Sequence, residues 1–345
     1  MKSLGTARLQ STTRLLARLF VLLLLWSGGV ARAQVTLFGT LDLYADYTSG
    51  AGSHLVRLDS SGLNTNRIGI KSVEPLGGDV SLTAYLEMGF NPDDGTLTGS
   101  GFDKLNYLSV LGPAGRIAMG KQYTPQFIVL SRLDAFGSSF WGTPYAVFAG
   151  GNRYTTATKA FQYQTPRMLG DRLQFSALYS LGASAATSTQ KQFFASTQLW
   201  ATDALYLAVV LGKDHRYTSA SPDRNLVLVG AGYDFGFVRV SGGFQTLKDP
   251  NSSAQVHEWT LGASMPVTSL TKVMFNYAKS SDQASVDKVA STFGFACVHA
   301  LSRSTSVYVS GARLLNGLNS SKNFGLVVNK GQATSDIMVG IRENF

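Results

Sequence analysis

The sequence has few of the features that stabilise small secreted domains or helical membrane proteins. It contains one cysteine, Cys297, so no intramolecular disulfide can form. Charged residues make up 15% of the chain, well below the roughly 25% of soluble domains. After the first 33 residues, no apolar run reaches the roughly 18 residues of a membrane-spanning helix, and no helical apolar period persists. These absences exclude a disulfide scaffold and further spanning helices.

Catalytic and metal-binding patterns are also missing. The four histidines, His54, His215, His257 and His299, are far apart and have no metal-ligand spacing. None is clearly joined to a Ser/His or Asp/His constellation of the kind that hydrolases need. We therefore expect no enzymatic activity, no metal site and no cofactor.

The N-terminus has the pattern of a secretory signal peptide. Leu19–Leu25 form an apolar run, and residues 31–33 form an A-x-A cleavage site. The run follows a basic segment that contains Lys2, Arg8, Arg14 and Arg18. A membrane anchor is the alternative, but the run is shorter than the roughly 20 residues that a spanning helix needs. Removing 33 of 345 residues leaves 312 and lowers the net charge from +9 to +4, because five bases and no acid are lost. The remaining charges are scattered, which argues against nucleic-acid binding.

Alternation of apolar and polar residues dominates the remaining sequence. The segment 333–345 is the clearest case, with Ile337, Val339 and Ile341 on one parity and Asp336 and Arg342 on the other. Successive side chains of a strand point to opposite faces, so this pattern predicts a strand with one apolar face. Residues 226–233 are apolar on both parities and cannot be oriented in this way.

The breaks between these segments alternate in length. Seven are short: 75–79, 112–115, 166–171, 201–203, 234–236, 266–269 and 301–304. Eight are longer and more polar: about 48–62, 91–103, 124–152, 181–190, 218–225, 249–254, 282–288 and 317–332. This pattern predicts an all-β fold, a transmembrane antiparallel barrel of about 16 strands over residues 34–345, as in bacterial outer membranes. A soluble β-sandwich or a β-solenoid is the alternative, but neither would need so many apolar strand residues.

The break at 124–152 is the longest and has an unusual composition. It contains Phe127, Phe136, Phe140, Trp141, Tyr145 and Phe148. Loops longer than about 12–15 residues are usually functional or disordered, and one this aromatic is unlikely to be solvated. A 16-stranded barrel has a water-filled channel. We therefore expect the loop to fold into the lumen and narrow it.

Several stretches resemble the general porins of Gram-negative bacteria, with most similarity to the trimeric porins of β-proteobacteria. They are 35–42 (VTLFGTLD), 66–78 (NRIGIKSVEPLGG), 84–90 (AYLEMGF), 120–123 (GKQY), 133–137 (LDAFG) and 340–345 (GIRENF). The resemblance implies a passive diffusion channel for ions and small hydrophilic solutes. It also implies a homotrimer in which the third loop, with Phe136 and Gly137 in its Phe-Gly motif, forms the constriction.

The resemblance further implies a basic wall in the constriction, at Arg67, Lys104 and Arg153. Arg67 and Lys104 each precede a short turn by eight residues, at Pro75 and Gly112, so they are expected at similar depth. Both have the polar parity that faces the lumen, where charged residues set ion selectivity. The alternative interpretation of each charge is a solvated lumen residue without special effect.

We expect few acidic residues on the opposite side of the constriction. Asp134 is the only acid in 124–152, and Ala135 occupies the position where the family often has glutamate. Glu87 and Asp42 also have lumen parity and could supply part of the acidic wall. More bases than acids predict a mildly anion-selective pore.

The resemblance assigns a role to the terminal Phe345 as a signal read by the barrel-assembly machinery. It places the protein in the outer membrane, in contact with its lipid and with lipopolysaccharide. Aromatic residues near strand ends, among them Tyr107, Trp259 and Tyr308, suit an interfacial girdle where they point outward. A substrate-selective porin and a structural or adhesin barrel remain as alternatives, distinguishable by saturable block and by negligible conductance.

Overall fold

The computed structural model describes residues 33–182, 191–215, 223–251 and 254–345. Its strands are β1 (Gln34–Gly50), β2 (Ser53–Ser60), β3 (Arg67–Gly77), β4 (Val80–Asn91), β5 (Thr96–Leu97), β6 (Asn106–Gly112), β7 (Gly115–Tyr123), β8 (Thr156–Gln164), β9 (Leu173–Ser180), β10 (Gln192–Trp200), β11 (Leu205–Asp214), β12 (Arg224–Asp234), β13 (Arg239–Lys248), β14 (Gln255–Pro266), β15 (Thr271–Asp282), β16 (Val289–Ala300), β17 (Thr305–Asn316) and β18 (Thr334–Asn344). The helical elements are α2 (Pro125–Leu133), η1 (Pro144–Ala146) and η2 (Gly151–Tyr154). Most of the predicted signal peptide lies outside the described residues.

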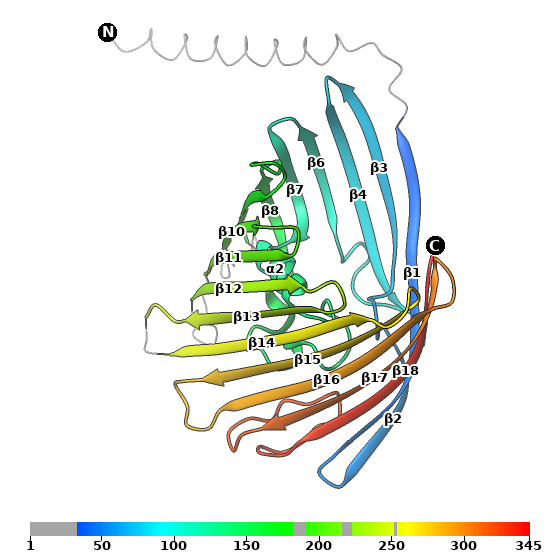
Figure 1. The fold of residues 1–345 in the computed structure, drawn as a ribbon, viewed down its shortest axis with the longest axis vertical. Coiled ribbons are helices and arrows are strands. Elements are labelled where there is room, and N and C mark those ends of the chain that lie inside the picture. Colours follow the sequence, from blue (N-terminus) through cyan, green and yellow to red (C-terminus); the bar gives the residue numbers. More distant parts are fainter. Residues whose placement is uncertain (1–32, 183–190, 216–222, 252–253) are drawn as a thin grey trace.

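The strands form one closed antiparallel barrel, in which sequence neighbours pair and β18 returns to β1 (Figure 1). The closing register runs from Thr40–Asn344 to Gly50–Thr334. Beyond β18, the backbone N–H of Gly39 donates to the carbonyl of Phe345 at 2.9 Å, and the N–H of Phe345 donates back at 3.1 Å. Closure removes both sheet edges, which a lipid environment requires.

The barrel has 16 strands although 18 segments carry labels. β2 pairs with the far half of β1 and β3 pairs with its near half, so these two segments form one barrel strand that is interrupted at residues 61–66. β5 is a two-residue strand that pairs only with the end of β4. The predicted strand number and the seven short turns are confirmed. The predicted long loop at 48–62 is wrong, because β1 and β2 continue as a hairpin with a tight turn at Ala51 and Gly52.

The two faces of the wall differ as the alternation predicts. Outward residues such as Ile337 and Val339 are 61% and 59% exposed, whereas their inward neighbours Asp336 and Met338 are 2% exposed. Large exposed apolar side chains recur on this outward parity around the barrel, which is the face that lipid covers in a membrane barrel. No helix among the described residues is long and apolar enough to cross a membrane.

The segment between β7 and β8, residues 124–155, folds inside the barrel, and we call it the inward loop (Figure 1). Its helix α2 begins after Thr124, whose hydroxyl accepts a hydrogen bond from the N–H of Phe127 at 3.1 Å, and Pro125 occupies the first helical turn. Both are favourable starts for a helix. Leu130 and Leu133 on α2 are fully buried against the barrel wall.

This packing explains why residues 226–233 are apolar on both parities. Leu226 and Leu228 face inward but belong to the same buried cluster as Leu130 and Leu133 of α2. The inner face of β12 is therefore dry where the inward loop covers it. Its apolar side chains stabilise the loop instead of meeting the channel water.

A row of inward-facing glycines lets the loop approach the wall. A Cβ on Gly230 of β12 would overlap Leu133, and one on Gly262 of β14 would lie 2.7 Å from Cβ of Ala135. On β16, a Cβ on Gly294 would lie 2.5 Å from the ring of Phe136. These distances are too short for nonbonded carbon atoms. The wall is therefore shaped to hold the loop in one position.

Candidate functional site

The open part of the lumen lies between the inward loop and strands β3, β4 and β7. A cavity of about 420 Å³ there is lined by Arg67, Glu87, Lys104 and Gly137, four of the residues that the sequence predicts for the constriction. A second cavity of about 370 Å³ shares Ser61, Ser138, Ser139, Tyr145 and Asn152 with the first. The two cavities therefore adjoin along one side of the inward loop.

Two of the predicted bases face this cavity. Arg67 begins β3, is half-buried, and forms no ion pair with any residue that the structure describes. Lys104 lies in the segment before β6, next to Asp103. Burial lowers the pKa of Lys104 below its ordinary value, and the charges of Asp103 and Glu87 partly offset this effect. Arg67 lies on β3 and Lys104 lies in the segment before β6, and the two side chains line the same space.

Two acids line the same cavity, Asp103 and Glu87 of β4. The carboxylate of Asp103 accepts hydrogen bonds from the N–H of Gly89 at 2.9 Å and the hydroxyl of Thr98 at 2.8 Å. The carboxylate of Glu87 accepts a hydrogen bond from the hydroxyl of Tyr85 at 2.8 Å, and Glu87 is only 3% exposed. Tyr85 stacks on Tyr107 with a ring distance of 5.1 Å. Tyr107 therefore faces the lumen and is no part of an outward girdle. Glu87 can moderate the positive field of the cavity without presenting much surface to solutes.

Asp42 is fully buried and binds the backbone at the interruption between β2 and β3. Its carboxylate accepts hydrogen bonds from the N–H groups of Leu63 at 2.8 Å and Asn64 at 2.6 Å. It also accepts one from the hydroxyl of Tyr308 at 2.5 Å. Tyr308 thus points inward, contrary to a place in the outward girdle, whereas Trp259 is 52% exposed on the outer face. Asp42 therefore accepts hydrogen bonds from these buried donors and holds the wall in place at the interruption between β2 and β3.

Asp134 has a similar task within the inward loop. Directly after α2, its carboxylate accepts hydrogen bonds from the N–H of Phe136 at 3.0 Å, the N–H of Ser138 at 2.8 Å and the hydroxyl of Thr143 at 2.7 Å. Burial outweighs these hydrogen bonds and raises the pKa of Asp134 to about 6. The carboxyl group closes the turn that carries Phe136 and Gly137, and it is absent from both cavities.

Arg153 lies at the end of the inward loop and is neutralised by Asp214 of β11. Its Nε and Nη2 atoms donate to the two carboxylate oxygens at 2.6 Å and 2.9 Å. This bidentate pair joins the loop to the wall. The structure therefore does not bring Arg153 together with Arg67 and Lys104 in the cavity.

A further acid beneath the inward loop, Glu258, also accepts hydrogen bonds from buried donors. Glu258 of β14 is fully buried, and its carboxylate accepts hydrogen bonds from the N–H of Ala149 at 2.5 Å and the amide of Gln245 at 2.6 Å. Gln245 accepts in turn from Gln126 of α2 at 2.8 Å. Glu258 was not predicted as a functional residue, although its lumen parity on an apolar strand was a usable signal.

Further bases on the lumen parity were also missed. They lie toward the short turns on five strands: Lys71, Arg116, Arg239, Lys272 and Arg342. Arg239 donates to the carbonyl of Arg132 in the inward loop at 3.1 Å, and Arg342 donates to Asn64 at 2.6 Å. Alternation alone could have found them, because each shares its parity with polar inward neighbours. The inner surface is therefore basic on this side of the constriction.

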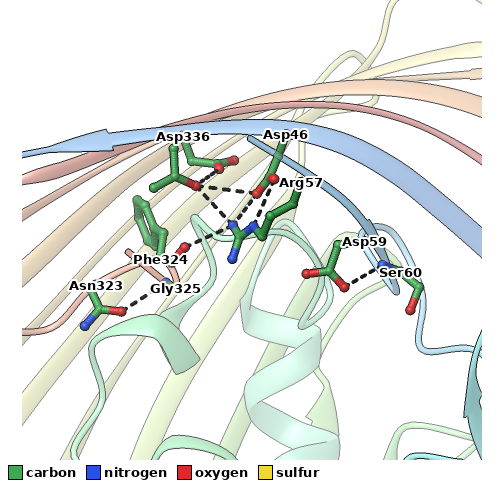
Figure 2. Close-up of polar contacts among 9 residues, drawn as sticks. Asp46, Arg57, Asp59, Ser60, Asn323, Phe324, Gly325 and Asp336 are labelled. Atoms are coloured by element: carbon green, nitrogen blue, oxygen red, sulfur yellow. Dashed lines mark hydrogen bonds and ion pairs between the residues drawn. The ribbon is translucent and has the colours of Figure 1, made fainter. Parts of the chain in front are cut away.

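A second loop reaches inward from the same end of the barrel as the inward loop, the end opposite the short turns. Arg57 of β2 donates through Nε to Asp46 at 3.0 Å, pairs through Nη2 with the other oxygen of Asp46, and donates to the carbonyl of Phe324 at 3.1 Å (Figure 2). Phe324 belongs to the loop 317–333 and is fully buried against Trp141 of the inward loop. Arg57 also lies 5.6 Å from the ring centre of Trp141. One guanidinium therefore joins β1, the loop 317–333 and the inward loop.

Replacing Arg57 by leucine should release the loop 317–333. The change leaves Asp46 buried without its cation, close to Asp336, and should lower the free energy of unfolding by about 3 kcal/mol, the lower end of the range for such pairs because Arg57 is partly exposed. Trypsin should then cleave after Lys322 faster than in the native protein. The control is Lys288→Leu, which removes an exposed ion pair with Asp282 and should cost at most about 1 kcal/mol. Equal unfolding midpoints and cleavage rates for the two variants would contradict this role of Arg57.

A comparison with known families identifies the fold and its setting. A family model described as Gram-negative porin matches residues 19–318. The chain belongs to the Gram-negative porin family. The predicted family, the barrel fold and the outer-membrane location are therefore confirmed.

Individual relatives agree with this assignment. The porin is 29% identical to outer membrane porin protein 32 of Delftia acidovorans, over 95% of this chain and 99% of the relative. Its fold matches the anion-selective porin from Comamonas acidovorans with a TM-score of 0.81 and 25% identity, over 91% of this chain and 100% of that one. The OmpF structure from Salmonella typhi, at 15% identity, gives a TM-score of 0.72 over 90% and 97% of the chains, which supports the fold alone.

Proposed function

We propose that this porin is an anion-preferring diffusion channel whose narrowest part lies between Arg67, Lys104 and the inward loop. The observation that carries this proposal is the unequal use of charges. Asp42, Asp134 and Glu258 are buried and bind loop backbone, and Asp214 neutralises Arg153. Glu87 and Asp103 face Arg67 and Lys104 in the first cavity. Further bases on the lumen parity, Lys71, Arg116 and Lys272, form no ion pair with a residue that the structure describes. Water in the pore therefore faces a net positive wall, which favours anions.

The residues predicted for the constriction divide into two roles under this proposal. Arg67, Lys104 and Glu87 set the field across the cavity, and Gly137 forms its edge on the inward loop. Asp42, Asp134, Arg153 and Phe136 hold the loop and the wall in place. The relative from Comamonas acidovorans is an anion-selective porin, which supports this division.

The experiment is conductance in planar bilayers with salts that differ in one ion. Replacing chloride by a larger anion at constant potassium should reduce single-channel conductance more than replacing potassium by a larger cation. Ohmic current without block by added sugars or organic anions supports a general diffusion pore. Saturable block by one solute class would indicate a substrate-selective porin, and absence of channels would indicate a structural barrel.

Several features of the cellular form belong to the same proposal. Residues 1–33 act as a cleaved signal peptide, and the mature barrel functions as a homotrimer without catalytic activity. The apolar outward face contacts outer-membrane lipid, including lipopolysaccharide in the outer leaflet. One solved porin from Vibrio cholerae is described in a trimer form, and its 14% identity supports the fold alone.

Deleting Phe345 should reduce assembly and leave the pore unchanged. Phe345 is 53% exposed and exchanges two backbone hydrogen bonds with Gly39, next to the seam between β18 and β1. We propose that it is the signal read by the barrel-assembly machinery. The yield of heat-resistant folded barrels should fall several-fold, while inserted barrels keep native conductance. Altered conductance in those barrels would mean that Phe345 also shapes the pore, and an unchanged yield would exclude the signal role.

A further inference from the structure

Three aromatic side chains form a continuous row on the lumen wall of β1, β4 and β6. Tyr85 and Tyr107 pair in the register of β4 and β6, and their rings stack with centres 5.1 Å apart. The ring of Phe38 on β1 lies 5.3 Å from that of Tyr85. All three residues are half-buried and have the parity of the inward residues on their strands. We call Phe38, Tyr85 and Tyr107 the ring row.

The ring row crosses β3, which lies between β1 and β4, at a glycine. Gly69 pairs with Phe38 in the register of β1 and β3, and a Cβ on Gly69 would lie 2.3 Å from the ring of Phe38. That distance is too short for nonbonded carbon atoms. A larger residue at position 69 would therefore displace the ring of Phe38. The glycine lets Phe38 lie flat across β3 and reach Tyr85.

The ring row faces the part of the lumen that helix α2 leaves open. This helix packs against β9–β14, whereas the row lies on β1, β4 and β6. Tyr85 lies two residues from Glu87 toward the short turn, or roughly 7 Å along β4. The row is therefore next to the first cavity on the side of the short turns, and its three residues do not line that cavity. Aromatic rings that face water on an otherwise polar lumen wall indicate a contact surface for a solute.

Two bases border the ring row. Lys71 of β3 pairs with Tyr85 in the register, and the guanidinium of Arg116 on β7 lies 4.8 Å from the ring centre of Tyr107. Neither base forms an ion pair with a residue in the described ranges. Glu87, which accepts the hydroxyl of Tyr85, is buried. The accessible charges of Lys71 and Arg116 beside the rings are therefore positive.

Rings and bases together favour a flat, negatively charged solute. An aromatic ring that stacks on another ring, or meets its edge, gains more than the burial of its area provides. Ammonium and guanidinium groups bind carboxylates through charge-assisted hydrogen bonds. A neutral sugar would use the rings without the bases, and chloride would use the bases without the rings. An aromatic carboxylate uses both.

We propose that the ring row, Lys71 and Arg116 form a binding site for aromatic carboxylates in the lumen. The aryl ring of the solute extends the row, and its carboxylate binds Lys71 or Arg116. The inference rests on the proposed anion-preferring channel and names a class of solute that this channel retains. Because the ring row does not line the first cavity, a bound solute leaves the narrowest part of the pore open to small ions.

The test compares three solutes of similar size. Purified porin in detergent micelles is titrated with benzoate, cyclohexanecarboxylate and benzamide, and binding is measured by saturation-transfer NMR against empty micelles. Cyclohexanecarboxylate has the charge without the aromatic ring, and benzamide has the ring without the charge. Phe38→Leu with Tyr107→Leu removes two rings from the lumen wall. The matched control is Phe275→Leu with Phe293→Leu, which removes two exposed rings from the outer face.

The native porin should bind benzoate at least about fivefold more tightly than it binds either comparison solute. The outer-face variant should keep this preference, and the lumen ring variant should lose it. The reversal potential of the ring variant in a KCl gradient should stay native, because no charge changes. Equal binding of benzoate and cyclohexanecarboxylate by the native porin would overturn the proposal, and so would an undiminished preference in the ring variant.

A second variant tests the bases independently of the rings. Lys71→Gln with Arg116→Gln should weaken the binding of benzoate to that of benzamide and leave the binding of benzamide unchanged. Unchanged benzoate binding by this variant would also overturn the proposal. The channel proposal fails separately, by a preference of the native porin for potassium over chloride, and that result does not depend on benzoate.

Discussion

Replacing Arg67 and Lys104 together by glutamate should turn the anion preference of the pore into a cation preference. Both side chains line one cavity of about 420 Å³, and the double change lowers its charge by four units. A unit charge about 6 Å from a permeating ion contributes about 0.7 kcal/mol even at the dielectric constant of water. Salt screens part of this energy. The chloride-to-potassium permeability ratio should therefore fall at least about tenfold.

The matched control for this prediction is Lys213→Glu. It makes the same kind of charge reversal on the outer face of β11, where the side chain points away from the lumen. Reversal potentials in a KCl gradient across neutral lipid measure both variants. If Lys213→Glu shifted the ratio as much as the double variant, the effect would come from overall charge, and the cavity would not be the selective region.

Replacing Gly230 by valine should displace the inward loop from the barrel wall. A side chain at this position overlaps Leu133, which is fully buried, and its Cβ would also lie 2.9 Å from the carbonyl of Gly242. Overpacking of this kind costs about 1–3 kcal/mol. The loop must move away from β12 toward the open cavity. We expect a lower unfolding midpoint and single-channel currents that fluctuate among several levels.

Gly232→Val provides the comparison, two residues along the same strand and on the same face. A Cβ at Gly232 would have its nearest neighbour, Cβ of Ser241, at 3.4 Å, which is an ordinary contact. This variant should keep a single conductance level and an unfolding midpoint near the native value. If the two valine variants behaved identically, the inward-facing glycines would not determine the position of the inward loop.

The alternation of the sequence was sufficient to predict the barrel, because side-chain direction in a strand depends only on parity. The same rule predicts that Arg67 and Glu87 face the lumen. Arg67 and Lys104 share a distance of eight residues from a short turn, and both line one cavity in the structure. The hairpin of β1 and β2 was missed because the polar segment 48–54 and the interruption at 61–66 leave only a short alternating run, in which Val56 and Leu58 point outward between Arg57 and Asp59.

The use of the acids could not be predicted from parity. Asp42 binds the backbone of Leu63 and Asn64, donors that meet it only when β1, β2 and β3 close around the interruption at 61–66. Arg153 and Asp214 are 61 residues apart, and their pairing depends on where the inward loop ends. Parity in the sequence therefore predicts which face of the wall a side chain occupies, but it does not predict which residue that side chain contacts.

The reversal potential of the native porin across a KCl gradient tests the central claim most directly. Purified porin is inserted into a planar bilayer of neutral lipid, and the zero-current potential is measured at a tenfold concentration difference. Because Asp42, Asp134 and Glu258 are bound to loop backbone while bases without an ion pair line the lumen, the sign should correspond to preferred chloride permeation. A zero-current potential with the sign of preferred potassium permeation would contradict this account of the pore.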